Sequence, residues 1–308
     1  MKVGIGITNF PWSAAEIGPR VASIARSADE AGFDSLWVMD HFFQIRISGE
    51  PPESPMLEAY GTLGYIGGQT RRIRLGTLVT SVAYRHPGVL IKTVTSLDVL
   101  TGGRMYLGVG AGAPWNVEPQ GPGTAFEAEG LGIPFPSLAD RFEGLEEVLQ
   151  IARQMWRGDE TPYHGKHYQL MRPLNSPNSL QRPHPPILIG GSGERKTLRL
   201  VAQYADACNL FDMPGTQFAG NIGHKLDVLR QHCDAVGRDY DSIEKTVTSN
   251  PDLAEGVPAL LDHLGDLAEI GIDHALMSPR GGWDQASLDA VAEILPEAHA
   301  LPRRSDAS

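Results

Sequence analysis

Short apolar runs alternate with longer amphipathic stretches along nearly the whole chain. Each apolar run stops at glycine or polar residues, as the buried strands of a parallel sheet do. The stretches between the runs carry apolar residues three or four positions apart, which is typical of helices with one buried face. The clearest of these helices spans residues 140–156, where one face carries Phe142, Leu145, Val148, Leu149, Ala152 and Trp156.

The alternation predicts eight strand–helix units. Strands are predicted at 2–8, 35–39, 73–79, 104–109, 186–189, 207–210, 243–248 and 274–277. Helices are predicted at 16–31, 57–69, 87–100, 140–156, 194–204, 216–236, 257–270 and 283–299. Eight such units fit a closed (β/α)8 barrel, the TIM barrel, whereas a doubly wound open sheet needs edge strands and usually has fewer units.

A single domain over residues 1–308 is predicted, because neither an internal repeat nor a linker divides the chain. Insertions are expected near 42–56, 113–137 and 159–185. Residues 113–136 are rich in glycine and proline and show no periodicity, and connections of that length are often functional lids. Residues 163–170 are predicted to form a small hairpin, and the end of the chain, 303–308, is expected to fray.

The charge balance narrows the range of partners. Lys and Arg number 26 against 37 Asp and Glu, and the net charge of −11 argues against general binding to nucleic acid or to an anionic membrane. The first residues have the pattern of a strand rather than of a signal peptide, and no stretch is suited to span a membrane, so a cytoplasmic location is expected. Cys208 and Cys233 are too few for a disulfide framework and lack metal-site spacing. Cys208, inside an apolar strand, is expected to be a reduced core thiol.

Three of the predicted strands end in residues suited to a binding site. Asp40 and His41 follow the second strand, residues 76–80 close the third, and residues 108–112 close the fourth. Residues just past the carboxyl ends of barrel strands face the same mouth, so these three segments are expected to converge there. The combination suits a large, planar, phosphorylated ligand with an acid or a base beside it.

His41 is the candidate acid or base, because histidine gains and loses a proton near neutral pH. Asp40 can hold a ring nitrogen or accept from an amide of a cofactor; the alternative is a local turn in which Asp40 caps backbone amides and His41 is half buried. Gly76 predicts a bulge against which a flat ring can rest, although a packed barrel strand explains the same residues. Gly110 and Gly112 permit close backbone contact, but the segment does not match the dinucleotide-binding fingerprint.

The best candidate for an anion site is the turn after the fifth predicted strand. Gly190, Gly191, Ser192 and Gly193 lead into a predicted helix whose first amides can bind phosphate, and Arg195 and Lys196 add positive charge. The turn is not a P-loop, and an ordinary tight turn remains the alternative. No metal site is expected, because His164, His167, His184 and His224 lack the spacing of metal ligands, and no nucleophile elbow of a hydrolase is present.

Together these segments resemble the bacterial luciferase-like family of flavin and deazaflavin oxidoreductases, and the resemblance covers nearly the whole chain. It is similar above all to the branch that uses the deazaflavin coenzyme F420. The residues that carry the resemblance are 31–41 (AGFDSLWVMDH), 74–80 (RLGTLVT), 100–104 (LTGGR), 107–112 (LGVGAG), 140–149 (DRFEGLEEVL) and 185–193 (PPILIGGSG).

The resemblance implies a (β/α)8 barrel with the cofactor ring across the carboxyl ends of the strands. It places a non-proline cis peptide at Leu78–Val79 behind the ring, Asp40 near the ring, and His41 near the reacting carbon. It implies phosphate binding by residues 190–193. The full cofactor site implied comprises Asp40, Leu78, Val79, Thr80, Gly110, Ala111, Gly112, Gly190, Gly191, Ser192, Gly193 and Arg195, with Asp40 and His41 as the catalytic residues.

Two departures from the sugar-phosphate dehydrogenases of this branch stand out. Those enzymes carry a tryptophan shortly after the histidine, where this chain has Phe42, Phe43, Gln44 and Ile45. They also carry a glutamate after the glycines of the fourth strand, where residues 113–115 here are Ala-Pro-Trp. Their acid/base pair is therefore expected to be incomplete here, and Trp115, Asn116 or another insertion residue is expected to shape a different, more apolar pocket.

The leading hypothesis is hydride transfer between F420 and a C=C, C=N or C=O bond or an alcohol of a small-molecule substrate, with His41 moving the proton. The alternatives are a two-component monooxygenase that uses reduced FMN and oxygen, and a non-catalytic F420-binding protein with an incomplete site. A metal-dependent barrel hydrolase would require a bound metal. The resemblance also implies a homodimer, for which helices at 57–67 and 89–100 are candidate interfaces.

Overall fold

The computed structural model describes residues 1–45, 50–112, 123–212, 221–279 and 281–301. One parallel sheet runs in the order β3-β2-β1-β11-β10-β9-β8-β5-β4. Its strands are β1 (Lys2–Ile7), β2 (Ser35–Val38), β3 (Arg74–Thr77), β4 (Thr80–Ser81), β5 (Leu107–Gly110), β8 (Ile187–Gly190), β9 (Ala207–Asp212), β10 (Glu244–Ser249) and β11 (His274–Met277).

The sheet closes on itself between β3 and the residues that lead into β5. The backbone N–H of Leu75 donates to the carbonyl of Arg104 at 2.9 Å, and the N–H of Tyr106 donates to the carbonyl of Leu75 at 2.7 Å. β3 and β4 together occupy the place of the third predicted strand, and Leu78–Val79 interrupts them. The closed (β/α)8 barrel is therefore confirmed, and the open-sheet alternative is excluded.

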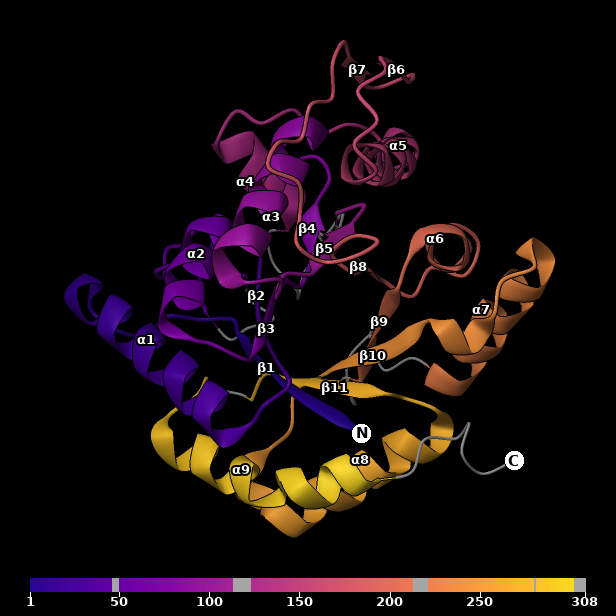
Figure 1. Ribbon diagram of the computed structural model, residues 1–308. Helices are drawn as coiled ribbons and strands as arrows, with labels where there is room; N and C mark the ends of the chain where they lie inside the picture. Colours follow the sequence, from indigo (N-terminus) through magenta and orange to yellow (C-terminus); the bar gives the residue numbers. More distant parts are fainter. Residues whose placement is uncertain (46–49, 113–122, 213–220, 280, 302–308) are drawn as a thin grey trace.

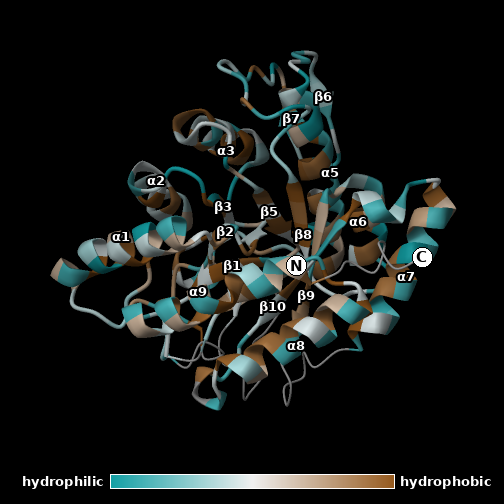
Figure 2. Cartoon of the chain, turned by 60° about the horizontal axis from the view of Figure 1, so that its bottom comes forward, coloured by the Kyte–Doolittle hydropathy of each residue, from teal (hydrophilic) through white to brown (hydrophobic). Residues whose placement is uncertain are grey.

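Helices surround the barrel (Figure 1). They are α1 (Ala14–Ala31), α2 (Ala59–Gln69), α3 (Pro87–Thr101), α5 (Leu138–Trp156), α6 (Thr197–Tyr204), α7 (Ile222–Val236), α8 (Val257–Ile270) and α9 (Gln285–Ala300). The central strands are mainly hydrophobic, whereas the helices alternate hydrophobic and hydrophilic residues (Figure 2), as the periodicity predicts. Within the described parts of the chain, none of the helices combines the length and the hydrophobicity needed to span a lipid bilayer.

The insertions contain two features that bear on the site. The predicted hairpin is confirmed as β6 (Tyr163–His164) paired with β7 (Gln169–Leu170). Residues 113–136 show no periodicity in sequence, yet they include the short helix α4 (Thr124–Gly130). Short 3-10 turns, Tyr240–Ser242 and Leu253–Glu255, join other elements. Trp115, Asn116, the start of the helix predicted at 216–236 and the expected fraying of 303–308 lie outside the described residues.

A buried polar network fills the end of the barrel opposite to the predicted mouth. Glu244, at the start of β10, accepts from Lys2 Nζ at 2.7 Å and from the Tyr106 hydroxyl at 3.1 Å, and His274 Nδ1 lies 3.4 Å from it. Burial raises the pKa of Glu244, but its hydrogen bond and charge interaction with His274 and the ammonium of Lys2 outweigh burial and hold that pKa well below its usual value. Polar residues at the amino-terminal end of barrel strands stabilise the fold rather than take part in chemistry.

Candidate active site

A cavity of about 450 Å³ opens at the carboxyl ends of the strands. The predicted site residues that line it are Asp40, His41, Leu78, Val79, Gly110, Ala111, Gly112, Gly190, Gly191, Ser192 and Gly193. Of the described lining residues, only Asp40 and His41 carry an ionisable side chain. The structure thus brings together the three strand ends that the sequence pattern placed at one mouth, and the glycine turn at residues 190–193 lies with them.

Two predicted site residues, Thr80 and Arg195, are not among the lining residues. Thr80 is fully buried, and its hydroxyl lies 2.7 Å from the Tyr60 hydroxyl and 3.1 Å from Thr77 Oγ1, behind the cavity wall. Arg195 is exposed, because residues 194–196 form a turn and α6 begins only at Thr197 rather than at the predicted residue 194. Lys196 lies nearer, with its ammonium 5.1 Å from the ring centroid of Phe142, which lines the cavity.

The back wall of the cavity is the interruption of the third strand. The Leu78–Val79 peptide bond is cis, as the resemblance implies. The Val79 side chain lies between two glycines of neighbouring strands: a Cβ atom would be 3.0 Å from Val79 on Gly110 and 2.9 Å from it on Gly190. Because those distances are shorter than ordinary carbon contacts, a side chain at either glycine would force Val79 to shift, and the wall beside Val79 is backbone on both sides.

Asp40 forms a buried ion pair with Arg85. The sequence pattern indicated Asp40 as a cofactor ligand or as a cap of backbone amides and did not predict this partner. The Arg85 guanidinium donates to both carboxylate oxygens, with Nη2 2.9 Å from Oδ1, and also contacts Glu58 Oε1 at 2.5 Å. Burial raises the pKa of Asp40 above its ordinary value, although the charge of Arg85 opposes that shift; the pKa of Arg85 is itself raised, so the guanidinium stays charged. Because Arg85 donates to both oxygens, the Asp40 carboxylate has a fixed orientation and is suited to orient a ligand.

His41 has a different carboxylate partner, Glu127 of α4. Nδ1 of His41 is hydrogen bonded to Glu127 Oε1, while Glu127 Oε2 accepts from the backbone N–H of Phe42 at 2.8 Å and from the Tyr84 hydroxyl at 2.9 Å. The Glu127 side chain is 1% exposed and that of His41 is 17% exposed. A glutamate therefore does contact the histidine, but it is a buried partner behind the ring and is not among the residues that line the cavity.

Sequence reasoning missed Glu127 because it lies 86 residues from His41, inside an insertion whose periodicity is masked by glycine and proline. The available signal is local: Glu127 and Ala128 share the buried side of a one- to two-turn helix, and a buried glutamate needs a partner. Arg85 was missed for the same reason, since nothing near it in sequence is acidic.

The glycine turn contributes backbone and hydroxyl groups. Gly191 has a φ of +118°, which glycine adopts readily, and the turn leads to the amino-terminal end of α6. Thr197, which the sequence analysis did not single out, is buried and lines the cavity beside Ser192. On the opposite wall, the ends of β1, β9, β10 and β11 present neutral polar side chains to the cavity: Thr8, Asn209, Thr248, Asn250 and Ser278.

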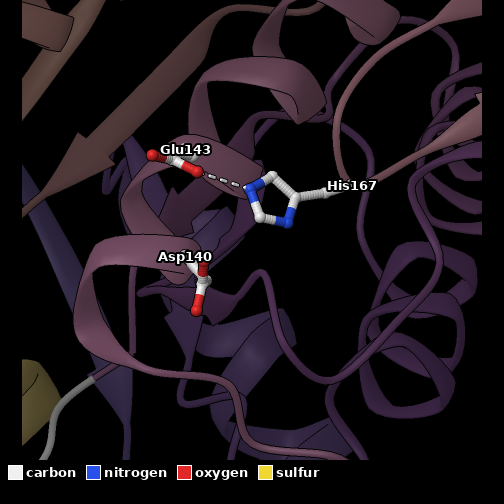
Figure 3. A group of neighbouring side chains, drawn as sticks. All are labelled: Asp140, Glu143 and His167. Carbon is white, nitrogen blue, oxygen red and sulfur yellow. Dashed lines mark hydrogen bonds and ion pairs between the residues drawn. The ribbon is translucent and has the colours of Figure 1, made fainter.

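Two features outside the cavity do not add chemistry to it. Asp140, Glu143 and His167 have ligand atoms within 4.8 Å of one another (Figure 3), but Glu143 already accepts from Lys166 and His167, and Asp140 accepts from Ser137. The ammonium of Lys166 also disfavours a cation there. Cys208 is buried, and burial raises the pKa of its thiol to about 12, so it is a core thiol as expected.

Comparison with known proteins extends the resemblance. Residues 1–293 match the family model described as luciferase-like monooxygenase. An F420-dependent glucose-6-phosphate dehydrogenase from Nakamurella multipartita is 31% identical over 241 residues, which make up 76% of this chain and 64% of that protein. The chain thus spans somewhat less than two thirds of the length of that relative.

Two solved structures share the fold at low sequence identity. An F420-dependent secondary alcohol dehydrogenase in complex with an F420–acetone adduct has a TM-score of 0.72 and 18% identity, covering 96% of this chain and 98% of that one. A riboflavin lyase with modified FMN and riboflavin has a TM-score of 0.75 and 13% identity, covering 98% of this chain and 92% of that one. At these identities the likeness concerns the fold alone.

Proposed function

The chain belongs to the luciferase-like monooxygenase family, and we propose that within it this protein is an F420-dependent oxidoreductase acting on a small organic substrate. The substrate would be an alcohol, or a compound with a C=C, C=N or C=O bond. The observation that carries the proposal is the meeting of His41, the Leu78–Val79 wall and the 190–193 turn around one cavity. The names of the relative and of the alcohol dehydrogenase support F420 as the cofactor.

The residues present fit such a cofactor. The backbone wall at Gly110 and Gly190 leaves room for a flat ring against Val79. Ser192, Thr197 and the amides of the glycine turn would hold a phosphate at the amino-terminal end of α6, with Lys196 at the rim. When bound, the deazaflavin would supply the hydride acceptor or donor.

The protein's own contribution is proton transfer and orientation. His41 lines the cavity, and a histidine exchanges protons near neutral pH, so it would take the proton of an alcohol or return one to a reduced product. Asp40, fixed by Arg85, would accept a hydrogen bond from the ring system and orient it. The apolar side chains of Leu138 and Phe142 would exclude water from the substrate.

An FMN-dependent monooxygenase is the second candidate function. It is favoured by the riboflavin lyase, whose structure contains modified FMN, and the Leu78–Val79 wall suits either tricyclic ring. A non-catalytic F420-binding protein is less well supported, because His41 lines the cavity and has a buried carboxylate partner in Glu127.

Titration of the purified protein with oxidised F420 and with FMN, followed by fluorescence, separates these functions. We expect F420 to bind at least about tenfold more tightly, a preference of about 1.4 kcal/mol. Equal or tighter FMN binding would assign the protein to the monooxygenases. Anaerobic reduction of bound F420 is then assayed with propan-2-ol and glucose 6-phosphate as first probes, followed by a broad panel. Tight binding without turnover across the panel would favour the non-catalytic protein.

We further propose that residues 1–308 act as one domain, in the cytoplasm, as a homodimer that binds small molecules rather than nucleic acid. The dimer proposal rests on α2 and α3, which pack side by side (Figure 1). Their outer face is uncharged over much of its length: α2 exposes Gly61, Gly64, Tyr65 and Gly68, and α3 exposes Val89 and Leu100. An exposed apolar patch of this kind marks a contact with another protein surface.

A further inference from the structure

We infer that Glu127 is a positioning residue that holds His41 in the tautomer with its proton on Nδ1, so that Nε2 is the proton acceptor in the cavity. The chemical purpose of this tautomer rests on the proposed function. With Nε2 unprotonated, His41 acts first as a base that accepts a proton from the substrate. The hydrogen bonds from which the tautomer is inferred are contacts within the protein and involve no cofactor.

The first step concerns the other oxygen of the Glu127 carboxylate. Oε2 accepts from the backbone N–H of Phe42, which can only donate, and from the Tyr84 hydroxyl. Burial, followed by the charge of Glu127, raises the pKa of Tyr84, so its hydroxyl keeps its proton and donates. These two donors fill the lone pairs of Oε2, so a carboxyl proton could lie only on Oε1, in the hydrogen bond to Nδ1 of His41. A carboxylic acid is ordinarily a stronger acid than an imidazolium, so the proton of that hydrogen bond belongs to Nδ1 and Oε1 is an acceptor.

The second step concerns the ring nitrogen that faces Glu127. Because Oε1 is an acceptor, Nδ1 of His41 must carry the proton of the hydrogen bond between them. In a neutral imidazole the other nitrogen, Nε2, then has the lone pair. The ring belongs to a side chain that lines the cavity, so this lone pair is available to a ligand there.

The surroundings make this arrangement rigid. Phe42, whose N–H is one of the two donors, packs its ring against Tyr84, the other donor, with ring centroids 4.8 Å apart. Glu127 is 1% exposed, so water does not compete for its oxygens. Three protein groups therefore donate to the carboxylate: His41 Nδ1 and Phe42 N–H from the connection between β2 and α2, and the Tyr84 hydroxyl from the connection between β4 and α3. The carboxylate cannot rotate without breaking these hydrogen bonds.

The consequence for catalysis is a base ready for alcohol oxidation. The O–H bond of the alcohol would break with its proton going to Nε2 of His41, and the electrons of that bond would form the C=O double bond. The hydride from the broken C–H bond would be accepted by the deazaflavin that the proposed function supplies. His41 becomes an imidazolium, whose positive charge is paired with the Glu127 carboxylate. Carbonyl reduction runs through the same imidazolium in reverse.

Glu127→Gln gives a sharp test, because it should invert the tautomer rather than merely weaken the bond. The amide oxygen must occupy the position of Oε2 to accept from Phe42 N–H and Tyr84 O–H. The amide NH₂ is then directed at Nδ1 and donates to it, which forces the His41 proton onto Nε2. The cavity would then contain a donor where the parent has an acceptor.

The experiment is ¹⁵N NMR of the histidine rings in full-length protein without added cofactor, at a pH of about 8.5, two units above the ordinary histidine pKa. Two-bond ¹H–¹⁵N spectra distinguish the protonated ring nitrogen from the unprotonated one, and His41→Asn identifies the His41 signals. We expect Nδ1–H in the parent and Nε2–H in Glu127→Gln. Glu129→Gln, an exposed position on the same helix, is the matched control and should resemble the parent.

A parent spectrum with the proton on Nε2 would overturn the inference, as would an unchanged tautomer in Glu127→Gln. The parent spectrum alone remains decisive if the variant does not fold. Turnover of F420 with an active alcohol should fall by about 10² to 10⁴ in Glu127→Gln, the cost of a wrong tautomer or a lost general base, with F420 affinity within about twofold of the parent. Failure of the parent to bind F420 would instead contradict the proposed function and leave the tautomer result intact.

Discussion

Arg85 holds the carboxylate of Asp40 from both oxygens, while the adjacent residue, His41, is held by Glu127. Two adjacent residues thus have different charged partners: Arg85 lies in the connection between β4 and α3, and Glu127 lies in α4. The separation gives the two side chains different tasks. The ion pair fixes a charge at the cavity edge, and the histidine keeps one nitrogen for proton transfer.

Replacing Asp40 should cost stability as well as cofactor affinity. Asp40→Asn leaves the Arg85 guanidinium without its buried partner, and loss of one member of a buried pair costs about 3 kcal/mol. Glu58→Gln is the matched control: its side chain is 46% exposed, so its loss should cost less than about 1 kcal/mol. Urea unfolding of both variants measures the difference. Equal effects would show that the Asp40 ion pair does not stabilise the cavity edge.

Removing the imidazole should affect turnover much more than binding. We expect His41→Ala to lower turnover of F420 by about two to four orders of magnitude, the usual contribution of a general acid or base. Cofactor affinity should be largely retained, because the phosphate turn is on the opposite strands. Steady-state kinetics with the active substrate and a fluorescence titration provide the two readouts. Unchanged turnover would remove His41 from the mechanism.

The two cations after the glycine turn should differ in their effect on cofactor binding. Lys196 lies against Phe142 at the cavity rim, whereas Arg195 is exposed and outside the lining. We expect Lys196→Ala to weaken F420 binding by up to about fivefold, roughly 1 kcal/mol, and Arg195→Ala to weaken it less. Raising the salt concentration should reduce the difference, because mobile ions screen exposed charges. A larger loss in Arg195→Ala would contradict the assignment of Lys196 to the rim.

The network at the other end of the barrel should contribute stability in a pH-dependent way. The pKa of Glu244 is lower in the folded protein than in the unfolded chain, so its contribution is complete above the unfolded value of about 4.3 and is lost as the pH falls through the folded value. Glu244→Gln should therefore cost about 2 kcal/mol at pH 7, and the difference from the parent should shrink below about pH 4.

Urea unfolding at several pH values measures that difference, with Glu269→Gln on the exposed side of α8 as the control. Glu244→Gln should leave F420 affinity unchanged, because the network lies opposite to the cavity. A difference that stays constant down to the lowest accessible pH would mean that the charge of Glu244 does not contribute.

The proposed dimer is tested at the α2–α3 face. Light scattering at micromolar concentration should give the mass of a dimer, and Leu100→Asp should shift the protein toward monomer, because a charge in an apolar interface must be desolvated. Met171→Asp is the control, since Met171 is similarly exposed but lies beyond the hairpin. A monomeric parent would contradict the proposal.

The regular elements could be predicted because each is specified locally. The helix at 257–270 and the strand at 274–277 agree with the prediction to the residue, since Gly256 and Gly271 bracket a strongly periodic segment. The third strand was less predictable: Gly76 indicated a bulge, but the cis peptide bond at Leu78–Val79 came from the family resemblance rather than from the pattern.

The partners of the site residues were not predictable in the same way. The pairing of Asp40 with Arg85 spans 45 residues and that of His41 with Glu127 spans 86, and neither leaves a periodic trace in the sequence. Side-chain pairs of this kind are set by how the insertions pack on the barrel, which is a tertiary property. The glycine turn, by contrast, was found at once because glycine has a backbone role at its own position.

The fit of Val79 between Gly110 and Gly190 links the interruption between β3 and β4 to β5 and β8 as one steric unit. An alanine at either glycine position would press on the Val79 side chain, and a smaller residue at position 79 should relieve that contact. Substitutions at the three positions should therefore be non-additive. Directed evolution that randomises these sites one at a time would then meet mostly inactive variants. A library that varies all three together is the route by which the shape of the wall can change.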